Sequence, residues 1–186
     1  MTVPSSVKPR VVFSRCLGFA CCRYDGMCIS DEFVDKLREQ VECITVCPET
    51  EIGLGVPRDP IRVIHTLQGR ILFQPATGRN LTGEMQVFSA AFLDSLPMID
   101  GFILKGRSPS CGIKDAKQFS PEGKIIGTGT GFFGEAVMKR FPHLAVEDEG
   151  RLKDRKNREH FLVKIFAKNK TSTTEAQRTQ RKEKII

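Results

Sequence analysis

The stretch SDEFVDKLREQVECITVC, residues 30–47, decides the fold, because a helical pattern leads directly into a short strand. In residues 30–41 the apolar side chains recur at helical spacing, and Ser30 or Asp31 can cap the start of the helix. Residues 43–47, CITVC, form a short apolar run that predicts a buried strand. A helix followed by a buried strand is typical of the repeating units of α/β proteins.

The same alternation continues on both sides of this stretch. Strands are predicted at residues 10–16, 100–105 and 143–149, a small hairpin at 61–66 and 70–74, and helices at 80–96, 131–141 and 151–168. Because the predicted strands are short and apolar, the pattern favours an α/β fold with a mostly parallel, Rossmann-like sheet. We expect helices on both faces of this sheet and one further helix towards the C-terminus.

Composition divides the chain into three segments. We expect an α/β domain that carries the site over residues 9–150, a C-terminal helix over 151–168 and a disordered basic tail over 169–186. Residues 151–186 contain 12 Lys or Arg against 4 Asp or Glu, which leaves 17 against 18 in residues 1–150. The body of the chain therefore gives no electrostatic argument for nucleic-acid binding, and only the tail could contact RNA weakly.

No segment of the sequence indicates a membrane-spanning helix or a signal for export. No apolar run approaches the ~20 residues that a membrane-spanning helix needs. The first residues, MTVPSSVKPRVVF, lack the layout of a signal peptide. We expect a cytoplasmic protein, in which an odd number of cysteines, seven here, argues against a disulfide framework.

Three of the cysteines are placed to meet at one edge of the predicted sheet. Cys16 ends the first strand, Cys47 ends the second, and Cys111 follows the third after a short loop. In open parallel sheets the binding site lies beyond the carboxyl ends of the strands, so we expect these three thiols to converge. The remaining cysteines do not share this placement: Cys21, Cys22, Cys28 and Cys43.

Three thiols without a nearby histidine favour iron over zinc. Structural zinc normally has four ligands in closely spaced pairs, and the spacing here matches poorly. Iron–sulfur clusters are held by thiolates, normally four, so a set of three would leave one iron open to a substrate. A non-catalytic zinc-binding or redox-sensing thiol domain remains the alternative.

Several stretches in combination resemble the DUF523 family, whose characterised members are thiouracil desulfidases. These stretches are VVFSRCLGFACCRYDG (11–26), VCPETEIGLGVPRDPIR (46–62), QPATGRNLT (74–82), DGFILKGRSPSCGIKD (100–115) and FPHLAVEDEGRL (141–152). The resemblance extends from about residue 9 to about residue 167. Longer relatives carry a second, all-helical DUF1722 domain after the last stretch, and the C-terminus resembles the start of that junction.

The resemblance implies an iron–sulfur enzyme. The implied cofactor is a 4Fe-4S cluster held by Cys16, Cys47 and Cys111, whose fourth iron is free to take the sulfur of a thiocarbonyl. Desulfidases of this type remove sulfur from 2-thiouracil or 4-thiouracil without net redox change, by a hydrolase-type cleavage of the carbon–sulfur bond. The expected partner is therefore a thiolated base or a related thioamide.

Such a reaction needs a general base that activates water. Glu49 lies two residues after Cys47 and is the expected catalytic base, with Glu42 and Glu51 as lesser candidates. The alternative is that Glu49 is a solvated carboxylate of the Gly- and Pro-rich loop predicted at residues 48–60.

The sequence indicates the roles of the other polar residues near the expected site less specifically. Resemblance favours Ser108 for a catalytic part, and we expect Ser110 and Asp25 to bind substrate, although all three could simply form turns. Arg58 is expected to pair with a carboxylate of its own loop rather than bind an anion. The Gly-rich residues 127–136 are expected to form a loop bordering the pocket.

Overall fold

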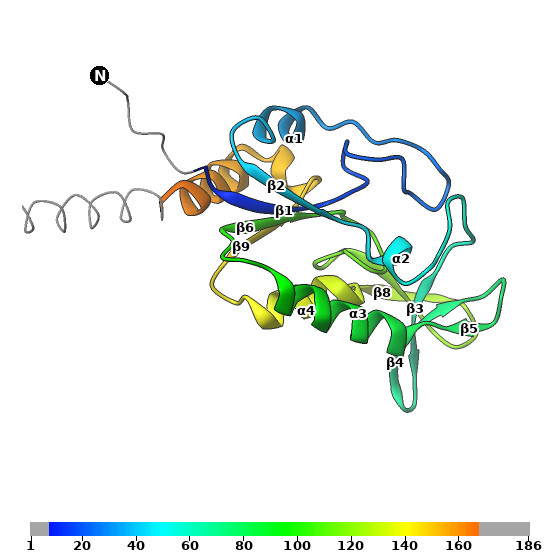
Figure 1. The fold of residues 1–186 in the computed structure, drawn as a ribbon. Helices are drawn as coiled ribbons and strands as arrows, with labels where there is room; N and C mark the ends of the chain where they lie inside the picture. Colours follow the sequence, from blue (N-terminus) through cyan, green and yellow to red (C-terminus); the bar gives the residue numbers. More distant parts are fainter. Residues whose placement is uncertain (1–7, 168–186) are drawn as a thin grey trace, which may run out of the picture.

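The computed structural model describes residues 8–167, and its centre is a fully parallel four-stranded sheet (Figure 1). The strands follow the order β2-β1-β6-β9. Their bounds are Glu42–Val46 for β2, Arg10–Ser14 for β1, Gly101–Leu104 for β6 and Ala145–Asp148 for β9. The four apolar runs predicted as strands are thus confirmed, together with the parallel sheet.

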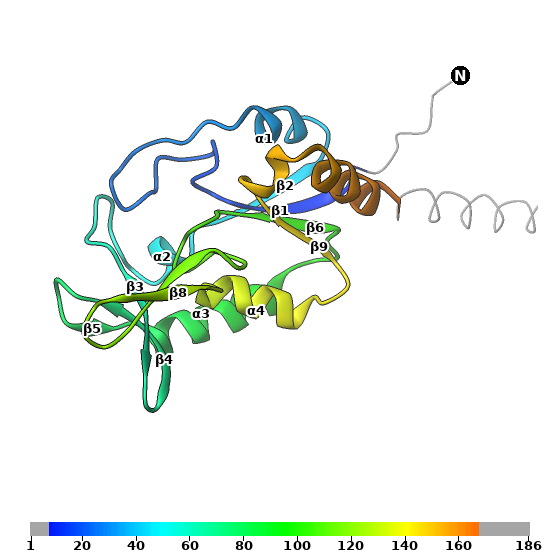
Figure 2. The same ribbon diagram turned by 180° about the vertical axis from the view of Figure 1, so that it is seen from behind.

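Helices cover both faces of this sheet, as predicted (Figures 1 and 2). On one face α3 and α4 pack against a core that includes Val12 and Phe102. On the other face α1 and the helix of residues 155–167 pack against Val11 and Phe13. The helix bounds are Glu32–Leu37 for α1, Thr82–Ser95 for α3 and Phe132–Arg140 for α4.

The helix α1 begins as the sequence predicts but ends earlier. Asp31 caps it, because its side chain accepts hydrogen bonds from the backbone amides of Phe33 and Val34. The helix stops at Leu37 instead of continuing to residue 41, since the Gln40 amide donates to the Leu37 carbonyl and tightens the chain into a turn.

A second sheet, which the sequence pattern did not predict, stands beyond the carboxyl edge of the first. Its order is β5-β4-β3-β7-β8, and only the β3–β7 pair is parallel. The bounds are Arg79–Asn80 for β5, Gly69–Gln74 for β4, Arg62–Thr66 for β3, Ala116–Phe119 for β7 and Ile125–Gly129 for β8. The hairpin of β3 and β4 was predicted, whereas β5, β7 and β8 were not.

Two segments predicted as loops have regular structure. Residues 127–129 of the expected Gly-rich loop end β8, because pairing with β7 satisfies the hydrogen-bonding groups of their backbone although two of the three residues are exposed. The expected loop 48–60 opens with the short helix α2, Pro48–Glu51, whose first position is a proline that needs no hydrogen-bond acceptor.

The C-terminal segment is helical in two parts. A 3-10 turn, η1, spans Arg151–Lys153, and residues 155–167 form the predicted α-helix, which buries Phe161 and Ile165 against the sheet. The tail expected over 169–186 lies outside the described residues. Among the described helices, none is both long and apolar enough to cross a membrane.

Candidate functional site

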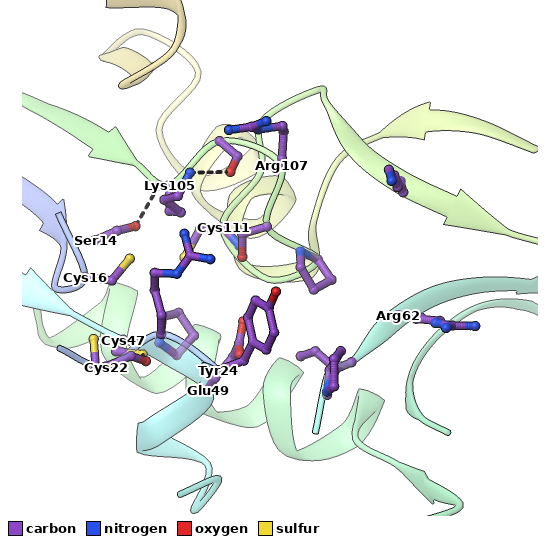
Figure 3. Close-up of a pocket in the computed structure, with 18 of the residues that line it drawn as sticks. Ser14, Cys16, Cys22, Tyr24, Cys47, Glu49, Arg62, Lys105, Arg107 and Cys111 are labelled. Atoms are coloured by element: carbon purple, nitrogen blue, oxygen red, sulfur yellow. Dashed lines mark hydrogen bonds between the residues drawn. The ribbon is translucent and has the colours of Figure 1, made fainter. Parts of the chain in front are cut away.

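Four buried cysteines line one cavity between the carboxyl edge of the parallel sheet and the second sheet (Figure 3). Cys16 follows β1, Cys47 follows β2, and Cys111 lies in the loop after β6. The cavity has a volume of about 770 Å³. The structure therefore brings together the three thiols that the strand ends predicted.

The fourth thiol of the cavity is Cys22, which the sequence placed elsewhere. Cys22 packs with Cys16 and Cys47 in one buried cluster, because the loop after β1 folds back and Leu17 pairs with Ile29. The spacing of the cysteines in the sequence does not indicate that this loop folds back.

The other three cysteines lie outside the cavity. Cys21 and Cys28 form a disulfide across the base of the loop that carries Cys22, with their Cα atoms 4.2 Å apart. The sequence argued against a disulfide framework and did not predict this single disulfide; the other five cysteines are free. Cys43 lies near the start of β2, at the opposite end of that strand from Cys47, as the sequence predicted.

The surroundings of three sulfurs of the cavity raise their pKa, which favours the neutral thiol form of Cys22, Cys47 and Cys111. Burial raises the pKa of Cys111 to about 12. Hydrogen bonding with Cys16 raises the pKa of Cys22, and hydrogen bonding with Cys22, together with burial, raises that of Cys47. A bound metal would reverse this preference, because a cation favours the thiolate form of its ligands.

The donor set fits an iron–sulfur cluster. Four cysteine sulfurs without an imidazole in one cavity are the usual surroundings of a 4Fe-4S cluster. Within residues 8–167 no three His, Cys, Asp or Glu side chains converge on the position of one metal ion. The ligands of a cluster with several irons bind at separate corners and do not need to converge in this way.

Glu49 lies on α2, in the wall of the cavity, and is tightly held. Its Oε2 accepts a hydrogen bond from Arg58 Nε at 2.8 Å and forms an ion pair with Arg58 Nη2 at 2.6 Å, and its Oε1 accepts a hydrogen bond from Ser110 Oγ at 3.0 Å. The side chains of Arg58 and Glu49 are only 6% and 13% exposed. Glu49 is therefore not a solvated loop carboxylate, and the predicted pairing of Arg58 is confirmed.

The two lesser candidates for the base lie away from the cavity. Glu51 pairs with Arg15 at 2.6 Å, and Glu42 pairs with Arg10 at 2.9 Å, in both cases with partly exposed side chains. Neither carboxylate contributes to the cavity wall.

The two serines before Cys111 have different surroundings. Ser108 lines the cavity, and its Oγ accepts hydrogen bonds from the backbone amides of Ser110 and Cys111 at 3.2 and 3.0 Å. Ser110 is fully buried behind the wall, and its hydroxyl donates to Glu49. Ser108 thus faces the cavity, while Ser110 contacts it only through Glu49.

Asp25 also lies behind the wall rather than in it. Its carboxylate accepts two hydrogen bonds from Arg23, at 3.0 and 2.7 Å, and one from the Met27 amide at 3.1 Å. The bonds from Arg23 lower the pKa of Asp25. Since Arg23 lines the cavity and Asp25 does not, Asp25 orients an arginine of the wall, and its bond from the Met27 amide is that of a turn.

Further basic side chains complete the wall of the cavity. Lys105 pairs with Glu149, and Arg62 lies over the ring of Phe119, 4.9 Å from its centroid. Arg107 has a positive φ of 60°, and its amide donates to Asp115 at 2.7 Å. Figure 3 shows Arg62 across the cavity from Cys16 and Cys47. This basic wall favours an anionic occupant.

Three comparisons connect the chain with known proteins. The family model described as 2-thiouracil desulfurase matches residues 11–149. A Bacillus subtilis (strain 168) protein, described as the uncharacterized protein YbbK, is 32% identical over 145 residues, which cover 74% of this chain and 95% of that protein.

The third comparison is with a solved structure, described as the 4Fe-4S-dependent thiouracil desulfidase TudS (DUF523Vcz). It is similar to this chain with a TM-score of 0.59 and a sequence identity of 27%. The similarity covers 78% of this chain and 94% of that one. The two chains therefore share their fold over nearly the whole length of the solved protein.

Proposed function

The chain belongs to the 2-thiouracil desulfurase family, and we propose that it is an iron–sulfur-dependent desulfidase of thiocarbonyl compounds such as 2- or 4-thiouracil. The observation that carries this proposal is the juxtaposition of buried cysteines with the held carboxylate of Glu49 in one cavity. The thiols supply a ligand set, and the carboxylate supplies a base.

Cys16, Cys47 and Cys111 would hold a 4Fe-4S cluster at the carboxyl edge of the sheet. When bound, the cluster supplies an iron with an open coordination position, which acts as a Lewis acid towards the sulfur of the substrate. The cavity volume of about 770 Å³ leaves space for a pyrimidine beside it. The basic wall compensates the negative charge of a cluster bound to thiolates.

The overall reaction is a hydrolysis. Water adds to the carbon that bears sulfur, the carbon–sulfur bond breaks, a carbonyl forms and the sulfur leaves as hydrogen sulfide. No electrons are exchanged, so the protein must supply only proton transfer and positioning.

Glu49 takes the proton from the attacking water, and its contacts indicate at which oxygen. A carboxylate has about four sites for hydrogen-bond donors, two on each oxygen. Oε2 accepts a hydrogen bond from Arg58 Nε and is also in ion-pair contact with Arg58 Nη2 at 2.6 Å, whereas Ser110 occupies one site of Oε1. The remaining site of Oε1 is therefore the one that accepts the proton.

Ser108 acts as a hydrogen-bond donor to the substrate. Its oxygen accepts from two backbone amides, which fixes the position of the hydroxyl in the wall of the cavity. A fixed O–H that faces the cavity can stabilise negative charge that develops on the thiocarbonyl or the ring. Ser110 and Asp25 serve as positioning residues, through Glu49 and Arg23 respectively.

The test is anaerobic reconstitution followed by a screen of sulfide release from thiolated pyrimidines. We expect a brown protein with about four irons and about four sulfides per chain, and loss of both the cluster and the activity in Cys111→Ala. Cys43→Ala, which changes a cysteine outside the cavity, is the matched control. A colourless protein that takes up stoichiometric zinc and no iron would overturn the proposal and favour the zinc-binding alternative.

A further inference from the structure

Cys22 is a buried thiol of the cavity without a role in the reaction described above. Its residue is 7% exposed, and it packs with Cys16 and Cys47 in a single cluster of sulfurs. Figure 3 shows it beside Cys47. Its carbonyl accepts from Cys47 Sγ at 3.8 Å and from Arg58 Nη1 at 3.1 Å. The backbone at Cys22 thus contacts both an expected ligand and the arginine that holds Glu49.

We propose that Cys22 is a fourth, exchangeable thiolate ligand of the cluster, which binds the open iron when no substrate is present. The inference rests on the proposed function. Its basis is the number of sulfurs in the cavity, because 4Fe-4S clusters normally have four thiolate ligands and the cavity offers four buried thiols.

The backbone around the other three cysteines is anchored by regular structure. The Arg15 amide next to Cys16 donates to the Val46 carbonyl, which joins the ends of β1 and β2. The carbonyl of Cys47 accepts from the Glu51 amide at 3.1 Å, within the first turn of α2. The Cys111 amide donates to Ser108 Oγ at 3.0 Å. Release of any of these thiols would disturb a strand end, a helix or a closed turn.

Cys22 instead lies in the middle of a loop without helix or strand. Gly18 and Gly26 flank the loop with positive φ angles of 85° and 73°, so the chain reverses direction on both sides of Cys22. A change in the position of Cys22 would stay within the loop that the Cys21–Cys28 disulfide closes, and it would leave the sheet and α2 in place. Among the four thiols, Cys22 is therefore the ligand that can leave and return.

Exchange at this position needs no oxidant or reductant. The Cys22 sulfur leaves the iron with its electron pair as a thiolate and takes up one proton, while the sulfur of the substrate takes its place. Because the Cys22 carbonyl accepts from Arg58, movement of the loop is also transmitted to the Arg58–Glu49 pair. Substrate binding would in this way be coupled to the arrangement of the base.

The experiment compares wild type, Cys22→Ala, Cys22→Ser and Cys43→Ala after anaerobic reconstitution without substrate. Iron and sulfide are quantified, and each sample is then treated briefly with ferricyanide and examined by EPR. An iron without a protein ligand is lost first on mild oxidation, which leaves a three-iron cluster with its own EPR signal. We expect this signal to be several-fold larger in Cys22→Ala than in wild type and Cys43→Ala, at equal initial iron content.

Each other outcome has a distinct meaning. Equal three-iron signals in wild type and Cys22→Ala would overturn the assignment of Cys22 as a ligand. Failure of both Cys22 variants to take up iron that the wild type binds would show a permanent rather than an exchangeable ligand. Absence of iron from the wild type itself would overturn the proposed function, and this inference with it.

Discussion

Arg58 donates through Nε to Oε2 of Glu49 at 2.8 Å, and its Nη2 forms an ion pair with the same oxygen at 2.6 Å. The pair is largely buried, and the hydroxyl of Ser110 donates to the other carboxylate oxygen, Oε1. The orientation of Glu49 in the cavity wall is therefore determined by one residue of its own loop and by a serine 61 residues away in the sequence.

Replacement of Glu49 by glutamine removes the proton acceptor and keeps the size of the side chain. We expect the rate of sulfide release to fall by ~10²–10⁴-fold, the usual contribution of a general base, while iron content is unchanged. Glu51→Gln, at a partly exposed pair outside the cavity, is the control and should retain wild-type activity. A Glu49→Gln protein that releases sulfide at the wild-type rate would contradict the assignment.

Arg58→Lys should destabilise the protein. A lysine keeps the charge but cannot reach Glu49 from two nitrogens while also donating to the carbonyls of Cys22 and Gly55, each 3.1 Å from Arg58 Nη1. We expect the free energy of unfolding to fall by ~1–3 kcal/mol, because buried hydrogen-bonding groups lose their partner. Denaturant titration measures this value, and Arg79→Lys, at an exposed pair with Glu84, should change it by less than ~1 kcal/mol.

Ser110→Ala should reduce activity without affecting the cluster. The hydroxyl of Ser110 is fully buried and donates to the oxygen of Glu49 that is proposed to accept the proton. Loss of a hydrogen bond to a charged group costs ~1.5–3 kcal/mol, which corresponds to a ~10–100-fold lower kcat if the position of Glu49 limits the reaction. Steady-state kinetics at equal iron content measure the effect, and an unchanged kcat would exclude this positioning role.

Alanine substitutions at two helix glycines test how closely α4 packs against the loop of Cys111, with Gly134 as the test position and Gly83 as the control. A Cβ on Gly134 of α4 would lie 2.5 Å from the Gly112 carbonyl oxygen and 2.7 Å from that of Cys111, whereas a Cβ on Gly83 of α3 meets nothing within 4 Å. Gly134→Ala should therefore destabilise the protein by ~1–3 kcal/mol and lower iron uptake, because it displaces the loop of Cys111. Gly83→Ala should instead stabilise the protein by ~0.5–1 kcal/mol. Thermal unfolding distinguishes the two, and equal effects would contradict the close packing.

The carboxyl group of Asp148 should make the free energy of unfolding depend on pH. Burial raises its pKa, and its Oδ2 is buried without a hydrogen-bond partner, while Oδ1 accepts from the Arg151 amide at 2.8 Å. A carboxyl whose pKa is raised in the folded state stabilises the fold most when protonated, so its contribution is lost as pH rises past the folded-state pKa. Asp148→Asn should therefore raise the free energy of unfolding by ~1 kcal/mol at about pH 8 and much less at about pH 4. Denaturation at both pH values tests this, and an equal effect at the two would contradict it.

The parallel sheet and the three expected thiols could be predicted because they depend on local pattern and one topological rule. Apolar runs identified the strands, and the rule for strand ends brought Cys16, Cys47 and Cys111 to one edge. The second sheet could not be predicted in the same way. The residues of β8 are mostly exposed and rich in glycine, so only their pairing with β7 makes them a strand.

The missed parts of the site depend on loop conformation. Cys22 enters the cavity because its loop folds back, and cysteine spacing does not encode that return. Ser108 and Ser110 are chemically identical neighbours, and the turn between them decides that Ser108 faces the cavity while Ser110 faces Glu49. From the sequence we expected Ser110 to bind substrate, and no local pattern indicated that its hydroxyl donates to Glu49.

The three expected ligands, Cys16, Cys47 and Cys111, are separated by 31 and 64 residues along the chain. A cluster bound to all three would act as a three-armed cross-link between the ends of β1, β2 and β6. Such a link closes two long loops, so it lowers the chain entropy of the unfolded protein and makes loaded molecules more resistant to heat and proteases than empty ones. Incorporation of iron would then be a step in the maturation of the fold as well as in the assembly of the site.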